Sequence, residues 1–276
     1  MRKIVFCILT LTLTCLNPIC SQEDGKFTVL LHTTAGDIRI LLFDDTPGHR
    51  DNFLNNVRNG MYDGVLFHRV INHFMIQTGN PDTRPDISEK VEPEDSAQLG
   101  PSIPAEICFP NHYHLRGMVA AARESDDINP EKRSSQYQFY IVTGKFLTEE
   151  KMMSIERDRL GDMIEQRYSE KLLANEEKIN SLRSERKLSN LSSLLDRLHL
   201  DAEEEIVEEH TQFFTDDIIK SYRINGGAPW LDGNYTVFGK VIDGMKVVNK
   251  IERSKTDPED KPIDDIRIIK ATIEQE

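Results

Sequence analysis

One segment of the chain places two polar side chains in an otherwise apolar setting. It reads Phe67-His68-Arg69-Val70-Ile71-Asn72-His73-Phe74-Met75-Ile76-Gln77. Because alternate residues of an extended strand share a face, Arg69 is expected to lie with Phe67, and Gln77 with Met75. Arginine carries a rigid, permanently charged fork of donors, and glutamine both donates and accepts hydrogen bonds. The pattern predicts a site that holds a substrate against an apolar surface and polarises it with a fixed cation.

Other kinds of catalytic site find less support. His68, His112 and His114 have no cysteine or carboxylate cluster beside them at the spacing of a metal site, so we interpret them as structural or solvated. Ser134 and Ser135 lack a recognisable nucleophile elbow and a base partner, which argues against a hydrolase. We therefore expect neither a metal ion nor a cofactor.

Three later segments complete a recognisable set. They are GMVAAAR at 117–123, QFYI at 138–141 and WLDGNYTVFG at 230–239. In this order, the four segments resemble the cyclophilin family of prolyl isomerases. The resemblance covers essentially all of residues 26–147 and 226–276, which we predict to form one discontinuous domain.

The resemblance implies a mainly β fold. The expected architecture is a closed eight-stranded β-barrel capped by two helices, with the substrate in a groove on its outer surface. The family's catalytic arginine falls on Arg69, with Gln77 beside it. Tyr235 stands where many members carry histidine. The substrate-binding positions fall on Phe74, Met75, Ala122, Gln138, Tyr140, Trp230, Leu231 and Tyr235.

The chemistry that these residues would serve needs no nucleophile. An X-Pro bond is nearly balanced between its isomers, but amide resonance separates them by a barrier of about 18–20 kcal/mol. A dry pocket that grips the proline ring, together with a fixed donor for the twisted amide, would lower that barrier. We expect Arg69 to be the donor and Gln77 to orient it and the substrate carbonyl. Arg123 and Glu124 bring charge to a groove edge that is neutral in many relatives.

The remaining pattern supplies the elements that must position these side chains. Residues 27–33 and 38–43 read as a β-hairpin, and a helix follows, with Thr46 as N-cap, Pro47 in its first turn and Gly60 at its end. Further predicted elements are strands at 66–71, 74–78, 118–123, 138–143, 236–241 and 266–273 and a helix at 243–253.

A long charged segment, 148–225, interrupts this pattern. It contains no proline, only one glycine, and 19 acidic against 12 basic residues. Leu188, Leu191, Leu195 and Leu198 recur at helical spacing, which predicts one buried face. Asp201 and the acidic residues after it resemble a new N-cap and first turn, so we expect two or three helices folded as a hairpin.

The insertion has two interpretations. It is a solvated spur, or it is an arm that holds unfolded clients beside the groove, since it lies between Tyr140 and Trp230. Nucleic acid is excluded as a partner by the net charge of −13, because binding phosphates requires a basic face.

The N-terminus is typical of an export signal. Arg2 and Lys3 precede an apolar run from Ile4 to Leu16 that is too short to span a bilayer comfortably. We predict a signal peptide at 1–21, cleaved after Ser21, and a location in the periplasm or cell envelope. Retention as a hydrophobic anchor and lipid modification of Cys20 are the alternatives; only a lipid on Cys20 would tie the mature chain to a membrane.

Three of the four cysteines, Cys7, Cys15 and Cys20, lie in this leader. The sequence therefore predicts no disulfide framework, and a buried, unreactive thiol at Cys108.

Three functions remain open at this point. The first is an isomerase that acts on proline-containing, unfolded or extended polypeptides during the folding of exported proteins. The second is a proline-peptide binding module or chaperone holdase with little catalysis. The third is a structural envelope protein whose partner is recognised by the acidic second half of the insertion.

Overall fold

The computed structural model describes residues 26–85, 101–209 and 212–275. The predicted signal peptide, its cleavage site and Cys20 lie outside these residues. Within them, no helix combines the length and the apolar character needed to cross a bilayer.

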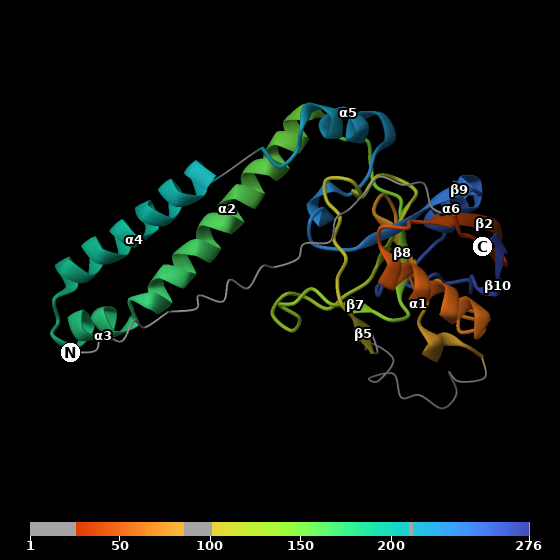
Figure 1. The fold of residues 1–276 in the computed structure, drawn as a ribbon, viewed down its shortest axis with the longest axis horizontal. Coiled ribbons are helices and arrows are strands. Elements are labelled where there is room, and N and C mark those ends of the chain that lie inside the picture. Colours follow the sequence, from red (N-terminus) through yellow and green to blue (C-terminus); the bar gives the residue numbers. More distant parts are fainter. Residues whose placement is uncertain (1–25, 86–100, 210–211, 276) are drawn as a thin grey trace, which may run out of the picture.

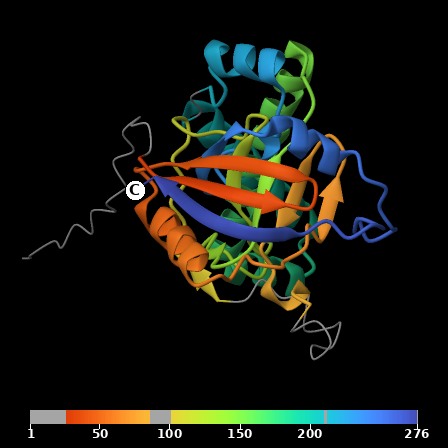
Figure 2. The same ribbon diagram turned by 90° about the vertical axis from the view of Figure 1, so that its right-hand side faces the viewer.

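Eight strands form one sheet, in the order β10-β1-β2-β9-β6-β8-β4-β3. Every neighbouring pair is antiparallel. Figure 2 shows the β1–β2 hairpin with β10 running beside it. The strands are β1 Thr28–Thr33, β2 Gly36–Leu42, β3 Arg69–Ile71, β4 Met75–Thr78, β6 Met118–Ala121, β8 Phe139–Val142, β9 Val237–Asp243 and β10 Ile268–Gln275. Two short strands, β5 Ser102–Ile103 and β7 Ser134–Ser135, pair separately.

The sheet curls but does not close as a continuous ladder. Among the described residues, its end strands β10 and β3 do not pair with one another, and β10 instead meets the segment before β3 through an isolated bridge between Leu66 and Arg267 and through the Phe67 N–H donating to Ile266 and the Ile268 N–H donating to Val65, each at 2.9 Å. The predicted closed barrel is therefore not confirmed, and the sheet is a curled half-barrel. The same bonds explain why the strand predicted from residue 66 begins only at Arg69.

The main core fills the concave side of the sheet. Helix α1, Pro47–Arg58, covers one opening with Phe53, Leu54 and Val57, and α6, Met245–Glu252, packs against the sheet elsewhere with Val248 and Ile251. These are the two predicted capping helices.

The start of α1 is stabilised in a way that local sequence does not show. Thr46 is the N-cap residue, but its hydroxyl makes no capping hydrogen bond. The Glu106 carboxylate instead accepts the N–H groups of Gly48 and His49 at 2.9 Å each. A carboxylate at a helix N-terminus satisfies free donors and complements the helix dipole.

The insertion contains four helices, where two or three were predicted. They are α2 Glu149–Ala174, α3 Glu176–Ser184, α4 Leu188–Glu209 and α5 Asp216–Asn225. Figure 1 shows α2 and α4 lying side by side and projecting away from the sheet, with α3 at the far end. Of the predicted leucine face, Leu198 is buried and Leu188 is exposed.

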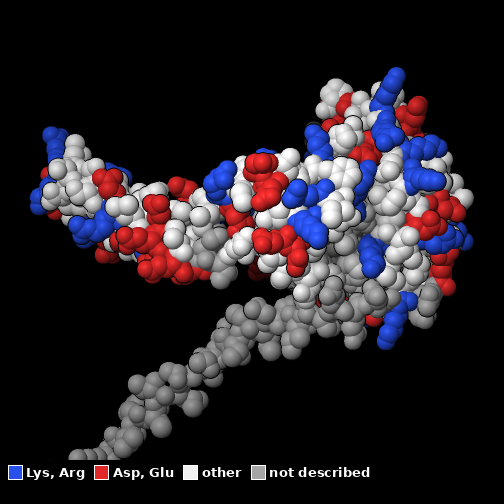
Figure 3. Space-filling view, turned by 90° about the horizontal axis from the view of Figure 1, so that it is seen from above, with Lys and Arg blue, Asp and Glu red and all other residues white. Residues whose placement is uncertain are grey.

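The prediction of a new helix at Asp201 is wrong, because Asp201 lies inside α4. The acidic run after it faces α2 in part. Glu205 accepts from Arg167 at 2.8 Å and from Lys171 at 2.6 Å, and Arg167 also pairs with Glu209. Charges of both signs cover the projecting helices in Figure 3. Because such exposed pairs contribute little individually, they orient the helices more than they stabilise them.

The base of the insertion is built into the fold. We call residues 149–160 and 212–225 the root and residues 161–209 the arm. The root buries a third apolar cluster, which packs against Phe109, Tyr113 and Leu115 of the β-rich part. Its buried members are Met152, Ile155, Phe214, Ile218 and Tyr222.

The prediction of a free thiol at Cys108 is wrong. Cys108 is disulfide-bonded, and the other three cysteines of the chain lie outside the described residues.

If the root belongs to the core, truncating it should destabilise the protein. We expect Phe214→Ala to lower the free energy of unfolding by about 3–5 kcal/mol, because the side chain is almost completely buried and its loss leaves a cavity. Urea unfolding measures the effect. Leu200→Ala, on the arm, is the matched control and should change the free energy by about 0.5 kcal/mol or less, since Leu200 is 56% exposed. Equal, small effects would contradict this account of the root.

Candidate active site

The two faces of the central strands carry different clusters. Ile76 of β4 and Ile141 of β8 point into the main core, whereas Met75 and Tyr140 point to the opposite face. This is the alternation of an extended strand, in which successive side chains leave on opposite sides. The outer face buries its own apolar cluster of Phe43, Met75, Ala120, Ala122, Tyr140, Val142, Ala228 and Val237, with Phe74, Leu231 and Tyr235 packed against it.

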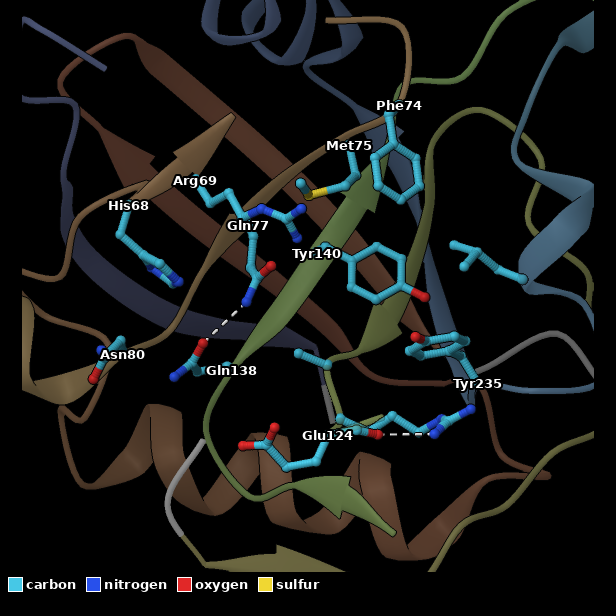
Figure 4. A pocket seen from close by; sticks show the side chains of 13 residues that line it. His68, Arg69, Phe74, Met75, Gln77, Asn80, Glu124, Gln138, Tyr140 and Tyr235 are labelled. Carbon is cyan, nitrogen blue, oxygen red and sulfur yellow. Dashed lines mark hydrogen bonds between the residues drawn. The ribbon is translucent and has the colours of Figure 1, made fainter. Parts of the chain in front are cut away.

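A cavity of about 330 Å³ opens on this outer face. Figure 4 shows Arg69, Phe74, Met75 and Tyr140 around the same space. Nine of the ten predicted site residues line it, and Trp230 does not. Trp230 is 42% exposed and lies at the rim, with its ring centroid 5.7 Å from that of Phe74. The lining residues are His68, Arg69, Phe74, Met75, Gln77, Asn80, Ala122, Arg123, Glu124, Gln138, Tyr140, Leu231 and Tyr235.

The polar side of the cavity is set by strand register. Arg69 of β3 stands directly opposite Gln77 of β4, so both side chains leave the same face. The Gln77 amide donates from Nε2 to Oε1 of Gln138 at 3.0 Å (Figure 4). Its carbonyl oxygen then points toward the open cavity. Arg69 is held more loosely: its Nε lies 3.7 Å from Oδ2 of Asp260, and the side chain is 45% exposed.

The turn before Phe74 is fixed by a buried carboxylate. His73 adopts a left-handed conformation, φ 61°, which costs a non-glycine residue about 1–2 kcal/mol. Its N–H donates to Glu252 at 3.0 Å, and Arg116 donates to the other oxygen of Glu252 at 2.6 Å. These bonds hold the strained turn, and with it the position of Phe74.

The wall of the cavity opposite Arg69 and Gln77 contains a cation–π contact. The guanidinium carbon of Arg123 lies 4.5 Å from the centroid of the Tyr235 ring. Arg123 also donates to the carbonyls of Asn234 at 2.7 Å and Glu124 at 2.8 Å. These contacts fix Arg123 against Tyr235. The charge that Arg123 was expected to bring to the groove edge is paired with Asp126.

The backbone N–H and carbonyl of Ala122 are both hydrogen-bonded within the protein. Its N–H donates to Gln138 at 3.0 Å and its carbonyl accepts from Ser135 at 2.7 Å. Ala122 thus contributes its methyl surface to the cavity. Among the described residues, the backbone N–H and carbonyl of the next residue, Arg123, have no such partner.

The sequence analysis missed His68 and Asn80 as lining residues. Both residues carry only a weak signal in the sequence. His68 directly precedes Arg69, and Asn80 follows β4 in a turn, where its side chain accepts the N–H of Asp82. Burial lowers the pKa of His68 to about 4. Hydrogen bonds with the Leu66 backbone and with Gln138 act in the opposite direction, but burial is the larger effect. The ring is therefore neutral at ordinary pH.

The site offers an apolar surface for binding and polar groups for polarising a substrate. Among the residues that the structure describes, no three histidine, cysteine or carboxylate side chains gather closely enough to hold a metal ion. Burial, together with Tyr235 and Asp232, raises the pKa of Tyr140 well above its usual value, so its hydroxyl stays protonated.

Comparison with known proteins decides the family. The model of the family described as "Cyclophilin type peptidyl-prolyl cis-trans isomerase/CLD" matches residues 28–155 and 159–273. The chain belongs to this family. It is therefore a cyclophilin-type isomerase, as the four sequence segments indicated.

Curated relatives of this cyclophilin include proteins of staphylococci. A Staphylococcus aureus (strain USA300) protein that carries the provisional name of a peptidyl-prolyl cis-trans isomerase is 26% identical over 254 residues, 92% of this chain and 94% of the relative. A Staphylococcus haemolyticus protein with the same name is 27% identical over 253 residues, 91% and 93% of the two chains. Matches of this length include most of the insertion.

Two solved structures share the fold. One is a cyclophilin-type isomerase of Cryptosporidium parvum, with a TM-score of 0.50, 21% identity and coverage of 91% of this chain and 99% of that one. The other is the same protein in the presence of the dipeptide Ala-Pro, with the same TM-score and identity, and coverage of 90% and 99%.

The lowered pKa of His68 predicts a pH effect on stability. Between pH 6.5 and 4 the unfolded chain gains a proton at this residue that the folded chain does not accept, so folding loses roughly 2–3 kcal/mol as the pH falls through this window. The free energy of unfolding, measured from pH 7 to pH 4.5, should fall less steeply in His68→Gln than in the unaltered chain. His32→Gln, at an exposed strand histidine, should keep the original slope. Identical slopes in all three proteins would contradict the buried, neutral state of His68.

Proposed function

We propose that this cyclophilin isomerises X-Pro bonds in exported polypeptides, with Arg69 stabilising the twisted prolyl amide above an apolar proline pocket. The pocket is formed by Phe74, Met75, Tyr140 and Leu231. One observation carries the proposal: a permanently charged guanidinium and this apolar wall share one cavity.

The geometry supports a division of roles. Rotation about the amide costs about 18–20 kcal/mol because resonance is lost, and the nitrogen of the twisted amide gains a lone pair that a donor can stabilise. Arg69 supplies such a donor with half of its side chain open to a substrate. Gln77, held by Gln138, presents an oriented amide, so the donors need little reorganisation during the reaction.

An extended substrate also needs backbone partners. The N–H and carbonyl of Arg123, which have no backbone partner in the described part of the chain, lie along the same wall, one residue beyond the predicted contact at Ala122. We assign them to the substrate backbone. The dipeptide Ala-Pro present with the Cryptosporidium relative supports a proline-containing ligand for this fold.

Export is supported by the leader and by the disulfide at Cys108, because structural disulfides form in oxidising compartments. The disulfide also bears on the processing site. The other cysteines all lie at or before residue 20, so a disulfide within one mature chain requires cleavage before Cys20 or retention of the leader. N-terminal sequencing and non-reducing mass analysis of the protein from its host would distinguish cleavage after Ser21, a lipid-modified Cys20 and a retained Cys20.

The arm is proposed to hold clients near the groove. Its support is apolar surface on an otherwise charged hairpin: Leu173, Leu188 and Leu200 are 74%, 67% and 56% exposed. Exposed leucines on a narrow helical projection are suited to transient contact with unfolded chains.

Removal of the Arg69 guanidinium should separate catalysis from binding. We expect Arg69→Ala to lower kcat/KM for a proline tetrapeptide by about 10²–10³-fold, the scale of losing one oriented donor. The dissociation constant of the peptide should change little. Arg253→Ala, at an exposed arginine away from the cavity, is the matched control. Full activity in Arg69→Ala would contradict the role assigned to Arg69, whereas peptide binding by the unaltered chain without isomerisation would leave the protein as a proline-peptide binding module.

Shortening the arm tests client binding without disturbing the root. Replacing residues 163–209 with a Gly-Ser linker of about six residues should leave peptide kcat/KM within about twofold, because the arm is remote from the cavity. Suppression of aggregation of an unfolded client should be lost. A full-length variant with Leu173→Ser, Leu188→Ser and Leu200→Ser should lose it too. Unchanged suppression in both proteins would leave the arm as a solvated spur.

A further inference from the structure

A fully buried carboxylate lies directly behind the proline pocket. Asp232 follows Trp230 and Leu231 in the chain, and its side chain is 0% exposed. It accepts the backbone N–H of His114 at 2.8 Å, the Nδ1 of the same histidine at 2.8 Å, and the hydroxyl of Tyr222 at 2.6 Å. A buried charge is tolerated only when several donors satisfy it in this way.

His114 connects the buried Asp232 carboxylate to the pocket. Its Nε2 lies 3.1 Å from the hydroxyl of Tyr140. Because a carboxylate can only accept, Nδ1 of His114 donates to Asp232, and the other ring nitrogen faces the Tyr140 hydroxyl. An unbroken series of hydrogen bonds therefore links Tyr222, Asp232, His114 and Tyr140, the last of which forms part of the wall of the pocket.

All four members of this chain are shielded from solvent. Tyr222 and Asp232 are 0% exposed, His114 1% and Tyr140 5%. Burial is the first cause that raises the pKa of Tyr222 and of Tyr140 well above the usual value, and the nearby Asp232 adds to it in both. Both hydroxyls thus stay protonated and available as hydrogen-bond donors.

Both segments of the root, one in α2 and one in α5, donate hydrogen bonds to Asp232. Tyr222 belongs to α5, and its hydroxyl donates to the Asp232 carboxylate. Arg159 belongs to α2 and donates from Nη1 to the Asp232 carbonyl at 2.9 Å, while its guanidinium lies 3.5 Å from the centroid of the Phe213 ring. The segment that carries Trp230 and Leu231 is therefore anchored from behind by the insertion.

We propose that Tyr222 is a positioning residue of the isomerase, so that the root of the insertion is a working part of the proline pocket. It acts on Tyr140 through Asp232 and His114, and on Leu231 through the backbone of Asp232. This inference rests on the proposed isomerase function.

Tyr222→Phe tests it, because the substitution removes one hydroxyl and keeps the ring in the apolar cluster. The Asp232 oxygen left without its donor should let the carboxylate and His114 shift. We expect kcat/KM to fall about tenfold, through weaker peptide binding and a lower kcat together. The downfield proton NMR signal of the His114 Nδ1–H, assigned by its loss in His114→Gln, should move.

Tyr113→Phe is the matched control. Tyr113 packs in the same cluster, with its ring centroid 5.6 Å from that of Tyr222, but its hydroxyl makes no hydrogen bond among the described residues. Its variant should keep both kcat/KM and the His114 signal. All proteins are full-length and compared per folded molecule, well below their unfolding midpoints.

The outcomes separate the two claims. If Tyr222→Phe lowers thermal stability but leaves kcat/KM, peptide affinity and the His114 signal unchanged, Tyr222 is only structural and the inference is overturned, while Arg69→Ala still reports on the isomerase. If the unaltered chain shows no isomerisation, the proposed function fails and the positioning role fails with it; if Arg69→Ala is fully active, only the role of Arg69 fails, and the comparison of Tyr222→Phe with Tyr113→Phe still decides the positioning role.

Discussion

The site depends on the register between β3 and β4. Arg69 and Gln77 oppose one another on this antiparallel pair, and the two-residue alternation that sends Ile76 into the main core sends Met75 and Gln77 outward. A slip of one residue would turn the charged and apolar site residues into the core and expose the core residues. The buried Glu252, which holds the strained turn at His73, protects this register. The polar and apolar halves of the cavity are thus consequences of a single strand pairing.

The insertion divides into parts with different physical roles. Its root contributes an apolar cluster and two hydrogen bonds to Asp232, from Tyr222 and from Arg159. It thereby completes the back of the pocket. Its arm is a narrow hairpin held by surface ion pairs and by a small apolar seam in which Ile179, Leu198, Ala202 and Ile206 are buried. Loss of the whole insertion would therefore combine two effects, disruption of the pocket and loss of a projecting surface.

Much of the site was predictable from the sequence, because its residues come in short segments with fixed local spacing. Strand alternation predicted that Gln77 and Met75 share a face, and the family resemblance predicted that Arg69, Phe74 and Met75 belong to one site. The expectation that Arg69 lies with Phe67 is wrong, because Phe67 precedes β3 and is buried in the main core. The capping helices were likewise visible in turn and capping signals such as Pro47 and Gly60.

The parts that failed or were missed depend on contacts between distant residues. Asp201 looks like a helix start locally, yet the helix continues because nothing breaks it and Glu205 pairs with residues more than thirty positions earlier. The strand predicted from residue 66 is shortened because Phe67 bonds to Ile266. His114, Asp232 and Tyr222 are ordinary residues in sequence, and only the fold brings them into one buried chain.

The central claim is that the cavity accelerates rotation about a prolyl bond, beyond merely holding a proline peptide. Exchange NMR of a proline peptide with a small amount of the protein tests this most directly, since uncatalysed interconversion takes tens to hundreds of seconds. We predict exchange cross-peaks between the cis and trans signals, with the ratio of the two populations unchanged. Chemical-shift changes that report binding, without any cross-peaks between the isomers, would contradict the account.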